Sequence, residues 1–223
     1  MVMNLSLIVL PGYRATLVDA SMPNHATEVQ AALAADGFSP GDIGQIIVTH
    51  HDIDHIGSLA QIAAANGATI LAHPVEAPYI TGAKKMVKYP TEEILAQDPK
   101  RKEVFDQIGF APVDQLIEDG EILCGGIRVI ATQGHCPGHI SLFVERSKIL
   151  ISGDALTSAE GKLAGPGVRA TPDMPAAIKS VRRLAGLPEV AAIVTYHGGL
   201  VTDDPLGQLK RVADELEAVT APA

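Results

Sequence analysis

Short apolar runs bounded by turn residues recur along the chain and predict β-strands. We expect the first strands at residues 6–10 and 16–19, joined by a turn at Pro11-Gly12, and the next at 46–49 and 69–72. Four apolar runs in the rest of the chain predict further strands at 127–132, 140–144, 149–152 and 192–195. Because these runs alternate with helix-like segments, we expect an α/β (α+β) fold with mixed sheets.

The helix-like segments carry recognisable start and stop signals. Thr27 and Gln30 have the spacing of a capping box, and Gly37 is placed to end the helix that they open. Gly67 closes an Ala-rich segment in the same way. The predicted helices begin at residues 27 and 39 and cover 58–66, 174–184 and 204–219.

Residues 76–118 interrupt the succession of strands and predict a helical insertion. The segment contains six of the 17 basic residues of the chain: Lys84, Lys85, Lys88, Lys100, Arg101 and Lys102. Two interpretations stay open, a lid that shapes a substrate pocket and attracts anions, or a solvated helical surface. No internal repeat or linker divides the chain, so we expect a single domain over residues 1–223 with this insertion at about 76–118.

Composition and charge narrow the class of protein. The 223 residues are 47% hydrophobic but only 4% aromatic, which predicts an aliphatic core. A formal net charge of −9 argues against nucleic acid or an anionic membrane as the main partner. Cys124 and Cys136 are too few for a disulfide framework, so we expect a cytoplasmic protein. Residues 1–10 have no basic leader and predict a strand instead of a signal peptide. A small-molecule substrate is the expected partner, and a homodimer is compatible with the sequence.

One loop carries most of the candidate chemistry. His50, Asp52, Asp54 and His55 follow directly after the predicted strand 46–49. In an extended segment, residues two apart point to the same side, so His50, Asp52 and Asp54 should share one side and His51 should point away. A turn at Asp54-His55 could then bring His55 toward a second metal. Four metal-binding side chains within six positions are a strong indication of a metal site.

Three other candidate ligands follow predicted strands and lie beside glycines. His135 follows Gly134, Asp154 follows Gly153, and His197 precedes Gly198. Functional groups are often carried on loops above a rigid sheet. Each position is weak by itself, but together they favour one metal-binding edge.

At this point the chain resembles the metallo-β-lactamase superfamily. The resemblance is carried by segments 49–57, 134–139, 152–154 and 196–198, in the order of the family, with an early strand ending at Asp19. It implies an αββα sandwich of two mixed β-sheets flanked by helices, with two metals at one edge.

The resemblance also implies a role for each residue. One metal would be bound by His50, Asp52 and His135, and a second by Asp54, His55 and His197, with Asp154 bridging the two. Asp54 and a metal-bridging hydroxide would act in catalysis, the hydroxide attacking the carbonyl of a small ester, thioester, lactone or amide. Zinc is the default metal.

Asp52 departs from the commonest pattern of the family, which has His there. Either Asp52 replaces the imidazole as a ligand, which we favour, or the first site is weak or empty. The additional carboxylate suits iron or manganese better than imidazole would. The alternative function is therefore an iron-dependent oxidoreductase of the same superfamily, with a persulfide-dioxygenase or flavodiiron-like site.

Several other residues have weaker claims. Tyr79, Tyr89, Lys84, Lys85 and Lys88 in the insertion are weak candidates for substrate binding. We expect Asp19 to support the metal loop through hydrogen bonds, and His139 either to orient a ligand or to be an ordinary hydrogen-bonded loop residue. Structural roles are expected for Cys136, His25 and His73.

Overall fold

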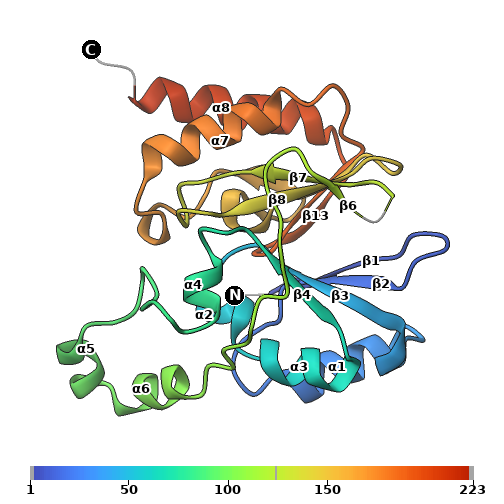
Figure 1. The fold of residues 1–223 in the computed structure, drawn as a ribbon. Coiled ribbons are helices and arrows are strands. Elements are labelled where there is room, and N and C mark those ends of the chain that lie inside the picture. The colour runs from blue at the N-terminus through green and yellow to red at the C-terminus, as the bar shows by residue number, and fades with distance from the viewer. Residues whose placement is uncertain (1–2, 124, 221–223) are drawn as a thin grey trace. The chain divides into compact units, whose positions relative to one another are not determined.

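The computed structural model describes residues 3–123 and 125–220, and its chain forms two compact units (Figure 1). The N-terminal unit is Leu5–Ile117, and the C-terminal unit is Glu118–Ala223 together with Met1–Asn4. Each unit has its own sheet and its own hydrophobic core. Cys124 lies outside the described residues. The expectation of a single domain stays a prediction.

The N-terminal unit is built on a five-stranded sheet in the order β1-β2-β3-β4-β5. β1 pairs antiparallel with β2, and the remaining neighbours are parallel, so the carboxyl ends of β2, β3 and β4 lie at one edge. The strands are β1 (Ser6–Ile8), β2 (Ala15–Val18), β3 (Ile43–Val48), β4 (Thr69–Ala72) and β5 (Gln115–Leu116). The loop containing His50 therefore begins at the edge where a sheet of this kind carries ligand-binding residues.

Two helices pack against this sheet, and Figure 1 shows them side by side. Val29 and Leu33 of α1 and Leu59 and Ile62 of α3 join strand residues in one apolar core. Gly67 ends α3 in a left-handed conformation, as expected. The helical elements of this unit are α1 (Ala26–Ala35), η1 (Pro40–Asp42), α2 (Ile53–Ile56), α3 (Leu59–Asn66), α4 (Ala77–Ile80), α5 (Glu92–Gln97) and α6 (Pro99–Asp106).

The expected capping box at Thr27 and Gln30 is wrong. Helix α1 begins after His25, whose side chain makes no capping hydrogen bond. A capping box occurs instead at Ser39 and Asp42, where the backbone N–H and hydroxyl of Ser39 both donate to the Asp42 carboxylate. These bonds hold the pKa of Asp42 below its usual value. The S/T-x-x-E/Q pattern misleads at Thr27 because the chain enters α1 before that residue.

Residues 76–118 contain the predicted helices, but the ends of the segment belong to the core of the unit. Ile80, Met86, Ile108 and Ala111 are all part of the same apolar cluster as the sheet. The segment also closes with β5, an edge strand that the hydrophobic pattern did not predict. The segment is thus integrated into the N-terminal unit at both ends, and its role as a lid stays a prediction.

The C-terminal unit contains a six-stranded sheet in the order β13-β12-β9-β8-β7-β6 and a separate hairpin, β10-β11. β12 pairs parallel with β9, and the other neighbours are antiparallel, so this sheet is also mixed. The strands are β6 (Ile122–Leu123), β7 (Ile127–Ala131), β8 (Ile140–Val144), β9 (Ile149–Ile151), β10 (Thr157–Ala159), β11 (Lys162–Ala164), β12 (Ala192–Thr195) and β13 (Gly199–Val201).

Helices α7 (Met174–Ala185) and α8 (Pro205–Thr220) lie together along this sheet (Figure 1). Val181 and Leu184 of α7 and Leu209 and Val212 of α8 bury their side chains against strand residues. Two short 3₁₀ turns, η2 (Gly153–Ala155) and η3 (Val168–Ala170), complete the unit. Among the described residues, no helix is long and apolar enough to cross a membrane.

Gly57 fixes how the chain leaves α2. A Cβ atom at this position would lie 2.1 Å from the backbone nitrogen of Pro23 and 2.4 Å from the carbonyl carbon of Met22. Both are backbone atoms, so neither can rotate away. We predict that Gly57→Ala lowers the free energy of unfolding by about 1–3 kcal/mol, the usual cost of overpacking.

Denaturant unfolding of the metal-free protein measures this effect. Gly41→Ala is the matched control, because nothing lies within 4 Å of a Cβ atom there. Equal stabilities of the two variants would contradict the close approach at Gly57.

Candidate metal centre

The loop after β3 is extended as far as Asp52 and then turns, with Asp54 and His55 in the turn, as the sequence predicted. Asp52 has extended backbone angles (φ −64°, ψ 152°) and is the N-cap residue of α2, whose first turn contains Asp54. The backbone N–H of His55 donates to the carbonyl of Asp52 at 2.9 Å. Asp54 and His55 are therefore presented by a helical turn, and the simple rule of alternating sides holds only as far as Asp52.

A buried carboxylate, Asp19, organises this loop, as expected. It accepts hydrogen bonds from the backbone N–H of Thr49 at 2.8 Å and from the Thr49 hydroxyl at 2.9 Å. Its Oδ2 also lies 2.9 Å from Nδ1 of His55. Because Nδ1 of His55 faces a carboxylate, it carries the proton, and Nε2 presents its lone pair as a metal ligand does.

Thr49 orients His50 in the same sense. Its hydroxyl oxygen lies 3.0 Å from Nδ1 of His50. A hydroxyl has a single proton, which Thr49 donates to Asp19, so its lone pair accepts from Nδ1–H of His50. The imidazole is thus held in the tautomer whose Nε2 can bind a metal.

The donor atoms of the loop lie close together. Nε2 of His50 is 3.4 Å from Oδ2 of Asp52, and Nε2 of His55 is 3.9 Å from Oδ2 of Asp54. The rings of His50 and His55 are 3.9 Å apart between centroids. Imidazole nitrogens and carboxylate oxygens at such separations suit a divalent metal of the first transition series.

His51 is engaged elsewhere within the unit. Its Nδ1 donates to the buried carboxylate of Glu76 in a short hydrogen bond, and its Nε2 accepts from the backbone N–H of Val87 at 3.1 Å. Its ring also stacks on that of Tyr79 at 4.2 Å. Both ring nitrogens are used in these bonds, which agrees with the expectation that His51 points away from the ligands.

The C-terminal unit groups its three candidates around one carboxylate oxygen. Oδ2 of Asp154 lies 3.4 Å from Nε2 of His135 and 3.4 Å from Nε2 of His197. The three candidate donor atoms of this unit are therefore grouped around one oxygen. The role of Asp154 as a bridge between two metals stays a prediction.

His139 positions Asp154 and is not itself placed as a ligand. Its Nδ1 lies 2.9 Å from the hydroxyl of Thr132, and its Nε2 accepts from the backbone N–H of Asp154 at 3.0 Å. The two loops that follow β7 and β9 are thereby tied together. Both alternatives for His139 thus hold in part: it is a hydrogen-bonded loop residue, and it orients Asp154.

The candidate substrate-binding residues of the insertion have partners within the N-terminal unit. Lys84 lies over the ring of Tyr79 at 4.6 Å, and Lys85 over that of Tyr89 at 4.5 Å. The ammonium of Lys88 pairs with the carboxylate of Asp52. A role in substrate binding stays a prediction for all five.

Structural roles agree with the contacts of His25 and His73 and with the burial of Cys136. His25 lies 3.1 Å from the hydroxyl of Ser21, and His73 accepts from the backbone N–H of Val75 at 3.3 Å. Cys136 is buried.

Sequence reasoning missed Glu76 as a functional residue. Its position four residues after β4, close to His73, was the available signal, but nothing local linked it to His51.

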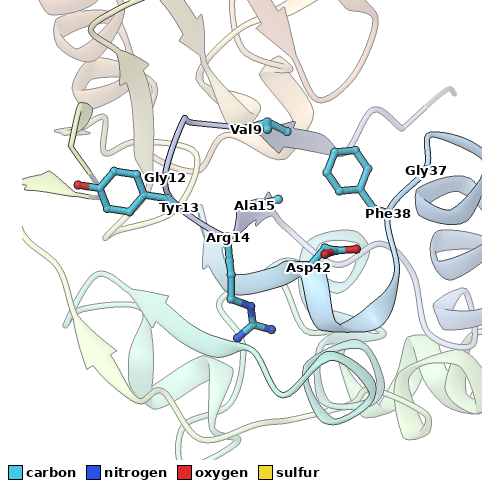
Figure 2. A pocket seen from close by; sticks show the side chains of 8 residues that line it. All are labelled: Val9, Gly12, Tyr13, Arg14, Ala15, Gly37, Phe38 and Asp42. Atoms are coloured by element: carbon cyan, nitrogen blue, oxygen red, sulfur yellow. The ribbon is translucent and has the colours of Figure 1, made fainter.

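A hollow of the N-terminal unit lies at the other end of the sheet from these ligands. Figure 2 shows its lining side chains around Ala15, which begins β2, whereas the metal loop follows the end of β3. The guanidinium of Arg14 donates to the carbonyls of Gly41 and Ile43 at 2.8 and 2.6 Å. Arg14 therefore has a structural role, because it links the start of β2 to residues 41–43.

Asp19 should influence metal affinity without touching the metal. We predict that Asp19→Asn weakens binding of a divalent metal about 10–100-fold, because an amide NH₂ cannot accept from Nδ1–H of His55. Asn tolerates the left-handed backbone at this position (φ 65°), so the fold should persist. Competition with a chelator measures the affinity.

Asp114→Asn is the control, because Asp114 accepts from the backbone N–H of Ile70 and belongs to no ligand loop. An unchanged affinity in Asp19→Asn would show that the orientation of His55 does not depend on this carboxylate.

Two comparisons of sequence relate the chain to known proteins. The family model of the metallo-beta-lactamase superfamily matches residues 3–197. The chain is 32% identical over 213 residues to the probable metallo-hydrolase YflN of Bacillus subtilis, covering 87% of this chain and 80% of the relative. It is 25% identical over 202 residues to a hydroxyacylglutathione hydrolase of Mesorhizobium japonicum, covering 86% of this chain but only 64% of that relative's length.

The fold is also similar to solved structures. A metallo-beta-lactamase family protein from Thermus thermophilus, TTHA1429, matches with a TM-score of 0.74 at 24% identity, covering 97% of this chain and 74% of that chain. This likeness confirms the predicted fold class. With the family model spanning most of the sequence, the chain belongs to the metallo-beta-lactamase superfamily of metallo-hydrolases.

Proposed function

We propose that this protein is a hydrolase that uses two divalent metals to cleave a small carbonyl substrate, with a thioester as the favoured class. The observation that carries the proposal is the donor chemistry of the two units. One unit pairs His50 with Asp52 and His55 with Asp54, and the other places Asp154 between two imidazoles. Seven such groups in the order of the family have no simpler common purpose.

The proposed ligands are those predicted from the sequence. One metal would be bound by His50, Asp52 and His135, the other by Asp54, His55 and His197, with Asp154 shared. Metals bound by such groups polarise a carbonyl and lower the pKa of water to about 7.

The chain's own residues supply orientation. Asp19 and Thr49 hold His55 and His50 in the tautomers whose Nε2 atoms can bind. His139 holds the backbone of Asp154. These bonds are made in advance of binding, so the ligands lose little conformational entropy when a metal enters.

The thioester class is supported by the relatives named hydroxyacylglutathione hydrolase, which match 82–86% of this chain in three of their representatives. Esters, lactones and amides require the same attack on a carbonyl, so they belong in the same screen. A cytoplasmic location, a small-molecule partner and a homodimer stay predictions.

The metal itself is proposed to be zinc. Asp52 adds a carboxylate, which favours harder cations, so manganese and iron are tested beside it. Bound iron with oxygen consumption and no hydrolysis would replace the hydrolase with the oxidoreductase alternative.

Substitution of the second-metal ligands tests the role of the loop. We predict that Asp54→Ala and His55→Ala each reduce turnover at least about 100-fold and remove one metal equivalent, since a lost ligand also removes the bound metal's Lewis acidity. Metal analysis and steady-state kinetics give the two readouts. His73→Ala, outside the ligand loops, should keep both. Full activity in either variant would contradict the proposal that Asp54 and His55 bind a metal needed for hydrolysis.

Metal removal tests the reaction class. Chelator treatment should abolish hydrolysis, and Zn²⁺ or Mn²⁺ should restore it, because the proposed nucleophile requires a bound cation. The assay compares glutathione thioesters, lactones, simple esters and β-lactams on the same preparation. Hydrolysis that survives chelation, with metal analysis showing an empty protein, would contradict the proposal.

A further inference from the structure

Two neighbouring residues of the metal loop pair with two neighbouring residues of the segment that follows α4. Nε2 of His51 accepts from the backbone N–H of Val87, and the next residue, Asp52, pairs with the next side chain, Lys88. The carboxylate of Glu76 accepts from Nδ1 of the His51 ring and from the backbone N–H of His51. The position of Lys88 is therefore set by backbone contacts as well as by its charge.

The ion pair lies beside the proposed metal ligands of the loop. The ammonium of Lys88 contacts Oδ2 of Asp52, and this same oxygen lies 3.4 Å from Nε2 of His50. Only 23% of the Lys88 side chain and 15% of the Asp52 side chain are exposed, so water screens the pair less than it screens a surface pair.

The neighbouring lysines do not share this arrangement. Lys84 lies over the ring of Tyr79, and Lys85, with 59% of its side chain exposed, lies 3.6 Å from Glu92 and over the ring of Tyr89. The basic character of the segment is therefore not uniform, and Lys88 is distinguished by its contact with a proposed ligand.

We propose that Lys88 is a positioning residue that holds the carboxylate of Asp52 and lowers the affinity of the His50–Asp52 pair for a divalent metal. The inference rests on the proposed function, because it assumes that Asp52 is a ligand. An ammonium on a ligand oxygen repels an arriving dication and competes for the same lone pairs. The His-to-Asp departure at position 52 is thus accompanied by a cation that offsets its additional negative charge.

The test compares Lys88→Met with Lys88→Arg, using Zn²⁺ alone as the probe and chelator competition as the readout. Lys88→Met should bind one Zn²⁺ equivalent at least about 10-fold more tightly than the unsubstituted protein, the usual size of the effect when a group that contacts a metal ligand is changed. Lys88→Arg retains the charge and should stay within about 3-fold. Lys85→Met is the matched control and should not change the affinity.

The variant Asp52→Asn identifies which of the bound Zn²⁺ ions Lys88 affects. The Zn²⁺ equivalent that Asp52→Asn weakens must be the one that Lys88→Met tightens, and Lys88→Met should add no tightening in an Asp52→Asn background. A second readout needs no metal: in chelator-treated protein, Lys88→Met should lower the Tm through loss of the ion pair, and Lys85→Met should not.

The outcomes separate this inference from the proposed function. If the unsubstituted chain binds no Zn²⁺, the proposed function fails. If it binds Zn²⁺ and Lys88→Met binds equally or more weakly, only the role of Lys88 is overturned. Tightening that persists in the Asp52→Asn background also overturns it, since Lys88 would then act without the carboxylate.

Discussion

One buried carboxylate, Asp19, orients His55 directly and His50 through Thr49, and both histidines are proposed metal ligands. Asp19 accepts from the backbone and hydroxyl of Thr49 and faces Nδ1 of His55. Its left-handed backbone lies at the end of β2, where the backbone N–H of Asp19 donates to the carbonyl of Ile47 in the neighbouring strand β3. A charge buried in this way is stable only when it is fully hydrogen-bonded, so the carboxylate and the metal loop hold each other in place.

The same principle separates the histidines proposed as ligands from the structural ones. An imidazole has two nitrogens. To bind a metal, one of them must carry a lone pair that is not already used in a hydrogen bond. In His50 and His55, Nδ1 faces a protein oxygen and Nε2 lies near a carboxylate of the loop. In His51 and His139, protein groups occupy both nitrogens. The number of histidines in the motif is therefore less informative than the partner of each nitrogen.

Charge balance links the loop to the segment 76–118. Replacing an imidazole by the Asp52 carboxylate adds one negative charge, and Lys88 adds one positive charge beside it. The net charge near the pair is then close to that of a histidine version, although the charges are distributed differently. The segment consequently contributes to the surroundings of the metal loop, because its Glu76 binds His51 and its Lys88 pairs with Asp52.

The sequence by itself determined the long strands, the principal helices and the candidate ligands, because apolar runs and strand-end polar residues are local patterns. It did not determine β5 or β13, whose few residues carry too little periodicity to be recognised. Only the tertiary structure decided that His51 belongs to Glu76 and Asp52 to Lys88. These partners are separated by 25 and 36 positions in the chain, and no local pattern encodes a pairing that depends on where two folded segments meet.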